Sequence, residues 1–121
     1  MKEEFLANID NPAVKREVES LFNNGAEFDQ ERMSVFIENG IRSHIVQTFP
    51  TAGSERILKN LNMDLRQAKR IFLIIKAERG LYWKSTEIVN SISEQTDADV
   101  LWNFQPVNEM NNVIKVVALS S

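Results

Sequence analysis

Apolar residues recur along this chain with two periods, one typical of helices and one typical of strands. Near the N-terminus, Asn11 followed by Pro12 predicts a helix start, because Asx side chains cap free N–H groups and proline suits the first helical position. One apolar stripe at helical spacing follows, formed by Val14, Val18, Leu21 and Phe22. Gly25 predicts the end of this helix, since glycine suits a left-handed C-cap.

A second helix is predicted from Asp29 to Asn39, closed by Gly40, with Met33, Phe36 and Ile37 buried. Residues 41–49 then alternate as a strand does, with Ile41, Ile45 and Phe49 on one side. Pro50 to Gly53 reads as a turn. Ser54 can cap a third helix that carries Ile57, Leu58 and Leu61 inward.

The apolar run from Ile71 to Ile75 is the strongest strand signal, and it predicts a central strand that is buried on both faces. A helix starting near Ser85 or Thr86 follows, with Ile88, Val89 and Ile92 as its buried stripe. Two closing strands are predicted, at Val100 to Phe104 and at Val113 to Leu119. Only a short loop separates them, so we expect these two strands to pair antiparallel as a wide hairpin.

In order, these elements predict an α+β domain of two layers. Two N-terminal helices precede the order β-α-β-α-β-β, which forms a mixed four-stranded sheet backed by helices. Right-handed crossovers place both crossover helices on the same face if each crossover moves the same way. We expect residues 1–26 to form an N-terminal helical segment and residues 27–121 to form the domain that carries the sheet.

Composition narrows the function classes. The length of 121 residues fits one domain, and 43% hydrophobic with 26% charged residues is typical of a folded globular chain. Zero cysteines exclude disulfides, thiolate zinc sites and a cysteine nucleophile. The start lacks the features of a signal peptide and no apolar run approaches a membrane span, which predicts a cytoplasmic protein without a membrane partner. A net charge of −3 without a basic block argues against nucleic-acid binding.

Enzyme motifs are sparse. The chain has no Walker-type phosphate loop and no GxGxxG sequence, and His44 is its single histidine. A histidine-based metal site or catalytic triad would therefore need unusual partners. We expect no metal and no cofactor in this chain, and no enzyme activity from the chain on its own.

Acidic and aromatic residues supply the candidate functional positions. Glu27, Asp29 and Glu31 lie at or just before a predicted helix start, where carboxylates also complement the helix dipole and cap free N–H groups. Tyr82 and Trp83 favour packing or a protein interface over base stacking, because Lys84 is the one basic residue among them. We expect Tyr82 and Trp83 to be partly exposed, as aromatics at protein interfaces often are.

Three segments resemble one known family in their order and spacing. Gly53-Ser54-Glu55-Arg56 stands where that family has a Gly-Glu-Asn-Arg helix start, and Ala68 to Gly80 resembles its next strand and turn. Asn108 to Asn111 and Val113 to Ser121 are similar to its closing loop and strand. The family is the FtsZ-like proteins of the tubulin/FtsZ superfamily, and the similarity covers residues 27–121 of this chain with their C-terminal domain.

This resemblance implies a polymer-interface domain of a cytoskeletal, cell-division GTPase. In the family, GTP lies between two subunits, and an acidic loop of one subunit polarises the water that attacks the nucleotide of the next. An ungapped alignment places Glu31 at one acidic position and Phe28 at the other. Asp29 or Glu27 would substitute only in a shifted register.

The resemblance also sets the expected partners. The family's glycine-rich nucleotide-binding domain has no counterpart in this sequence, so GTP and Mg²⁺ are expected only on a partner domain. That partner is an FtsZ-like GTPase domain or a homologous subunit, as in a homo-oligomer. The expected interface residues are Glu27, Tyr82 and Trp83. The alternative interpretation is a stand-alone α+β regulatory or adaptor module that binds a protein or a small ligand.

Overall fold

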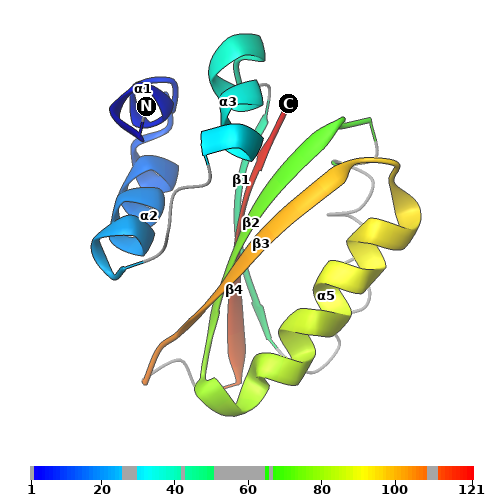
Figure 1. The fold of residues 1–121 in the computed structure, drawn as a ribbon. Helices are drawn as coiled ribbons and strands as arrows, with labels where there is room; N and C mark the ends of the chain where they lie inside the picture. The colour runs from blue at the N-terminus through cyan, green and yellow to red at the C-terminus, as the bar shows by residue number, and fades with distance from the viewer. Residues whose placement is uncertain (1, 26–29, 42, 51–64, 66, 109–111) are drawn as a thin grey trace.

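Helices cover both faces of a mixed β-sheet in the computed structural model, which describes residues 2–25, 30–41, 43–50, 65, 67–108 and 112–121 (Figure 1). One face carries three helices, namely α1 (Lys2–Ala7), α2 (Pro12–Asn23) and α3 (Gln30–Asn39). The other face carries α5 (Tyr82–Gln95). The predicted α+β class with a mixed sheet is confirmed, but the predicted two layers are wrong, because the sheet is apolar on both faces and helices cover each of them. The predicted helix that starts at Ser54 lies outside the described residues, as does the side chain of Ile37.

The sheet has the strand order β1-β4-β2-β3. Its members are β1 (Ser43–Pro50), β2 (Arg70–Ala77), β3 (Asp99–Pro106) and β4 (Val113–Ser120). β4 runs antiparallel to both β1 and β2, while β3 runs parallel to β2. The predicted hairpin between the two closing strands is therefore wrong, because β2 separates β3 from β4. The physical reason is burial: β4 is apolar on both faces, so it takes an interior place with a strand on each side.

Each face of the sheet supports its own core. The side chains of Leu73 and Ile75 in β2 pack with α5, together with Val116 and Ala118 of β4. The intervening residues of the same two strands pack against the N-terminal helices, in a cluster that includes Phe5, Val14, Val18, Met33, Phe36, Phe72, Ile74, Val117 and Leu119. Because residues 5 to 21 share this cluster with the sheet, the N-terminal segment is packed on the domain. The sequence did not predict α1, whose Phe5 is fully buried.

Local signals account for both ends of α2. Asn11 Oδ1 accepts hydrogen bonds from Ala13 N at 2.9 Å and from Val14 N at 3.3 Å, which confirms the predicted N-cap. Gly25 follows the helix with φ +96°, and Gly40 follows α3 with φ +77°. Both values lie in the left-handed region that glycine adopts without strain.

The start of α5 differs from the prediction. The helix begins at Tyr82, directly after a 3₁₀ turn over Arg79–Leu81, and not at Ser85 or Thr86. The hydroxyls of Ser85 and Thr86 donate to the carbonyls three residues earlier, as they can inside a helix, so neither acts as the N-cap. The predicted buried stripe of Ile88, Val89 and Ile92 is confirmed. No helix in the described parts of the chain has the length and apolar character needed to cross a bilayer.

Truncation of β2 tests the two-core arrangement. We expect Leu73→Ala and Ile74→Ala each to lower the free energy of unfolding by about 2–5 kcal/mol. Each substitution removes buried side-chain atoms from one of the two cores and leaves a cavity there. Urea melts give these values. The control is Asn90→Ala on the exposed side of α5, which should change stability by less than about 0.5 kcal/mol. A loss under about 1 kcal/mol at either strand position would contradict the assignment of that core.

Candidate protein-association surface

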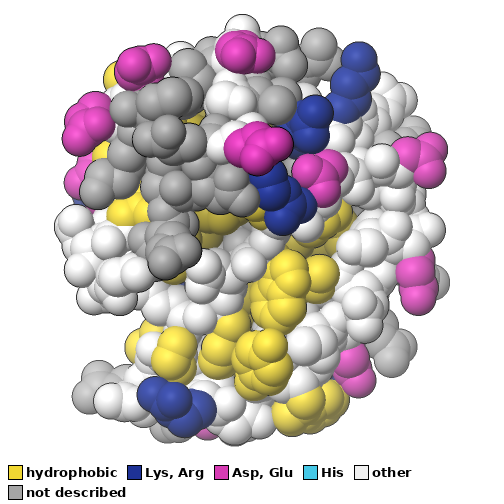
Figure 2. Space-filling model, viewed as in Figure 1, with side chains coloured by type: hydrophobic (Ala, Val, Ile, Leu, Met, Phe, Trp, Pro, Cys, Tyr) yellow, Lys and Arg dark blue, Asp and Glu magenta, His cyan; other side chains and the backbone are white. Residues whose placement is uncertain are grey.

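β3 forms an edge of the sheet and is only half buried along most of its length. Its neighbour β2 is buried almost throughout. The half-buried residues of β3 include Val100, Leu101, Trp102 and Phe104, all of them apolar. Figure 2 shows hydrophobic side chains gathered in a hollow between the N-terminal helices and α5. β3 thus gives this face of the molecule an apolar strip.

An aromatic cluster of Tyr82, Trp102 and Phe104 joins α5 to this strip. Tyr82 stacks on Trp102 with ring centroids 6.0 Å apart, and it meets Phe104 edge-on at 5.3 Å. Tyr82 is 50% exposed and its neighbour Trp83 is 55% exposed, which confirms the predicted exposure. Lys84 Nζ lies 5.7 Å from the Trp83 ring centroid, within cation–π range. Exposed aromatics beside polar groups are typical of protein-binding surfaces.

Two hollows border β3 on the side of the N-terminal helices. One has a volume of about 320 Å³ and lies between α2, α3 and β3, where Phe22, Met33 and Leu101 contribute apolar walls and Arg32 a charge. The other has a volume of about 530 Å³ and lies between the end of α2 and residues 103–106. These hollows add concave surface, partly polar and partly apolar, beside the strip.

Glu31 is exposed in the first turn of α3. Its neighbour Arg32 donates from Nη2 to Asp99 Oδ1 at 2.8 Å, and Arg70 Nη1 lies 3.4 Å from Asp99 Oδ2. These side chains are 35–43% exposed, so each ion pair stabilises the fold by about 1 kcal/mol at most. The network nevertheless ties the start of α3 to the start of β3.

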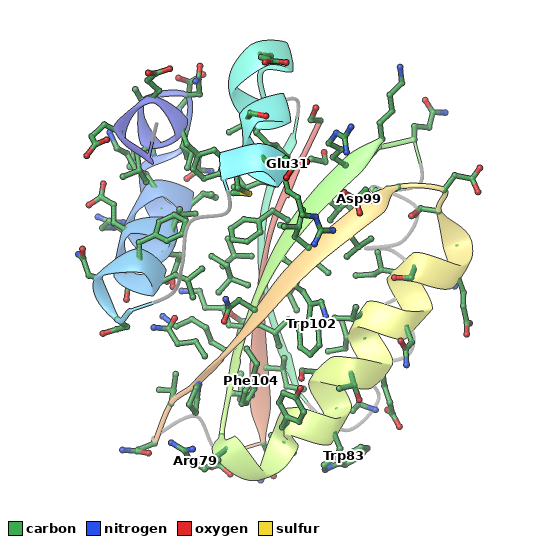
Figure 3. The ribbon with its side chains drawn as sticks, in the orientation of Figure 1. Glu31, Arg79, Trp83, Asp99, Trp102 and Phe104 are labelled. Atoms are coloured by element: carbon green, nitrogen blue, oxygen red, sulfur yellow. The ribbon has the colours of Figure 1, made fainter. Side chains whose placement is uncertain are left out.

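The structure does not bring the predicted site residues together. Glu31 lies at the Asp99 end of β3, whereas Trp83 lies near Phe104 at the other end (Figure 3). Eight residues of strand separate the ends, a distance of about 25 Å at ~3.3 Å per residue. Glu27 and Asp29 lie outside the described residues, as does the side chain of His44. In the part of the chain that is described, no group of three or more acidic or histidine side chains is arranged to hold a metal ion.

The sequence analysis missed an ionic cluster under α2. Lys76 Nζ donates to Glu17 Oε2 at 2.7 Å, and Lys115 Nζ donates to Glu17 Oε1. The side chain of Glu17 is only 15% exposed. Burial alone raises the pKa of this carboxyl, but the hydrogen bonds from Lys115 and Lys76 outweigh burial and hold the pKa below its ordinary value. The sequence does contain a signal for this cluster, namely the single lysine in each of two largely apolar strands, Lys76 in β2 and Lys115 in β4.

Comparisons with known proteins add no relative to this picture. No protein-family model matches the chain, and a search of curated proteins finds no match either. The surface around β3 is therefore interpreted from its own geometry.

Neutralising Glu17 tests the ionic cluster. We expect Glu17→Gln to lower the free energy of unfolding by about 3 kcal/mol at neutral pH, since it leaves two partly buried ammonium groups without a counter-charge. The matched control is Glu87→Gln in α5, whose carboxylate is 55% exposed and pairs with Lys84, and which should cost about 1 kcal/mol or less.

The same variant has a defined pH dependence. Because folding lowers the pKa of Glu17, its contribution is fully present above the ordinary pKa of 4.5 and is lost as the pH falls through the lower folded-state pKa. The stability difference between wild type and Glu17→Gln should therefore shrink on acidification. Urea melts between neutral and acidic pH measure it, and a difference that grows towards low pH would contradict the assigned direction.

Proposed function

We propose that this chain is a protein-association domain of an FtsZ-like assembly, which contacts the nucleotide-binding domain of a neighbouring subunit. The observation that carries the proposal is the exposure of Tyr82 and Trp83 beside the half-buried strip of β3. Large aromatic side chains supply most of the binding free energy at many protein interfaces. This surface favours a macromolecular partner.

The order of the elements supports the choice of family. Three helices, α1 to α3, precede β1, and β2, α5, β3 and β4 then follow one another in the order that the resemblance implies, although β3 and β4 do not pair as a hairpin. The full order β-α-β-α-β-β is part of the proposal, because its first crossover helix falls within residues 51–64, which are not described. GTP and Mg²⁺ belong to the partner domain in this proposal.

Glu31 is the candidate for a catalytic share in a neighbouring subunit. Its carboxylate is exposed at the start of α3, while its main-chain carbonyl accepts a hydrogen bond from Ser34 Oγ at 2.8 Å. A carboxylate acts on a water molecule only within hydrogen-bond reach, so the partner's nucleotide would have to lie against this end of β3. Asp29 and Glu27 precede Glu31 in the same acidic segment and remain predictions for the same role.

A single partner could reach both ends of the strip. The length of β3, about 25 Å, is comparable to the diameter of a small domain, about 30 Å. Such a partner would lie along β3, with its nucleotide near Glu31 and an apolar pocket near Trp83.

The alternative function is a stand-alone regulatory module that binds a small ligand. The observation that favours it is the hollow of about 320 Å³ between α2, α3 and β3, which falls at the lower end of the range for ligand pockets. Its apolar wall includes Phe72 and Leu101, while the charge of Arg32 at its edge is already paired with Asp99. NMR chemical shifts that change on adding a ligand only at these residues would support this alternative. The chain would then also show no affinity for a nucleotide-binding domain.

Removal of one exposed aromatic ring tests the association surface. We expect Trp83→Ala to weaken binding to the GTPase domain of an FtsZ-like protein by at least about tenfold, as truncation of an interface aromatic typically does. Calorimetry measures the affinity, and the melting temperature should stay within a few degrees because the ring is already half exposed. The control is Glu94→Ala near the other end of α5, which should bind normally. Equal affinity for wild type and Trp83→Ala would remove this residue from the interface.

Replacement of Glu31 by glutamine tests whether its carboxylate contributes to GTP hydrolysis in a neighbouring subunit. In a chain fused to such a GTPase domain, Glu31→Gln should lower GTP turnover by about 10²-fold or more, while assembly and melting temperature are retained. Glu38→Gln is the matched control, because Glu38 is also exposed on α3 but lies near its other end. Unchanged turnover in Glu31→Gln would leave this residue with only a helix-dipole role.

A further inference from the structure

The outer side of β3 carries, in a regular pattern, main-chain groups that pair with no other strand among the described residues. Asp99 N donates to Lys69 O at 3.0 Å, and Val107 N donates to Ala77 O at 2.9 Å, so the odd-numbered residues point their N–H and C=O groups towards β2. The polar groups of alternate strand residues point to opposite sides. Those of the even-numbered residues therefore point away from the sheet, and no strand of the described residues pairs with them. They are Val100, Trp102 and Phe104.

At each end of this open segment, the next outward-pointing residue has no N–H group available for strand pairing. On one side, the N–H of Ala98 donates to Thr96 Oγ1 at 3.2 Å and is not available for pairing. On the other side, Pro106 has no N–H group. Ala98 and Pro106 are equally distant from Trp102 in sequence, and so are Val100 and Phe104. The open edge is therefore symmetric about Trp102.

We propose that two copies of this chain associate through β3, antiparallel, about a two-fold axis at Trp102. In this register Trp102 faces Trp102 of the second copy, and Val100 faces Phe104. Residues that face each other with outward groups exchange N–H and C=O hydrogen bonds in an antiparallel pair. Every outward N–H between the two closed ends then has an acceptor, and one continuous sheet runs through both copies.

Side chains on both faces fit the same register. Val100, Trp102 and Phe104 pack on the α5 side, so apolar side chains meet apolar side chains across the axis. On the other side, Leu101 faces Asn103 and Asp99 faces Gln105, so no like charges oppose each other. The strand also lacks the lysines that commonly protect sheet edges from pairing.

A second copy fits this edge better than an unrelated extended peptide. A foreign strand requires an open edge, but it does not require the two ends of that edge to be equivalent about one residue. This contact shares β3 with the proposed association with a nucleotide-binding domain, but Trp83 and Glu31 lie outside β3. Variants at Trp83 or Glu31 therefore test that association without changing the strand pairing.

Amide hydrogen exchange of the wild-type chain tests the contact directly. At high concentration, the amides of Val100, Trp102 and Phe104 should be protected, and dilution should lower their protection by about tenfold or more. Sedimentation should show a dimer becoming a monomer over the same concentration range. The amides of Leu101 and Asn103 are internal controls, because they face β2 and should stay protected throughout.

Three results would overturn the proposal. The first is a chain that stays monomeric at every concentration. The second is a dimer whose three outward amides exchange as fast as in the monomer, which would place the dimer contact elsewhere. The third is protection of these amides by an unrelated alternating Thr-Val peptide in a chain that does not dimerise, which would assign the edge to a foreign strand.

A charge swap tests the register. Trp102→Lys and Trp102→Glu should each be monomeric, because position 102 faces its own counterpart and like charges there repel. An equimolar mixture of the two variants should dimerise again. Trp83→Lys is the control and should remain dimeric, and circular dichroism verifies that each variant is folded. Dimers in both single variants, or a mixture that stays monomeric, would reject a two-fold axis at Trp102.

Discussion

The pairing of β2 with β4 is the contact on which both helical layers of this protein depend. The two strands are adjacent, antiparallel and apolar on both faces, with Leu73 opposite Ala118 and Ile74 opposite Val117. Successive pairs point to opposite sides, so each side of this ladder exposes apolar surface unless helices cover it. α5 covers one side and the N-terminal helices cover the other. The three layers, helices on either side of one sheet, follow from this one double-sided pair of strands.

The same pair of strands places two lysine side chains opposite each other, and a carboxylate of α2 offsets their repulsion. Lys76 and Lys115 are direct cross-strand partners, and like charges at such positions repel each other. Glu17 reaches them from α2 and accepts a hydrogen bond from each, which turns the repulsion into an ionic cluster between helix and sheet. This arrangement fixes where α2 lies over the sheet. A purely apolar contact would specify that position less strictly, because hydrophobic burial is non-directional.

Local signals predicted part of this structure, and tertiary contacts determined the rest. The Asn11 cap and the central strand at Ile71 to Ile75 were predictable because neighbouring residues determine them. The hairpin failed because closeness in sequence favoured β3 as the partner of β4, whereas two-sided burial placed β4 between β1 and β2. The Glu17 cluster joins residues 59 and 98 positions apart, a separation that no local pattern reports. Exposure of Trp83 was predictable, but its distance from Glu31 was not.

The edge strand β3 connects the two association surfaces in one physical argument. A sheet edge with open main-chain groups and apolar side chains associates unless charge, proline or a covering element prevents it. Here the hydrogen bond from Ala98 N to Thr96 Oγ1 limits one end of the open edge and Pro106 limits the other, so the open groups are confined to the middle of the strand. The exposed ring of Trp83 and the carboxylate of Glu31 lie outside β3, near its opposite ends (Figure 3). Strand pairing would therefore occupy the middle of β3 and leave both flanking side chains accessible, but a nucleotide-binding domain that reaches both ends of β3 would compete with the second copy for this strand.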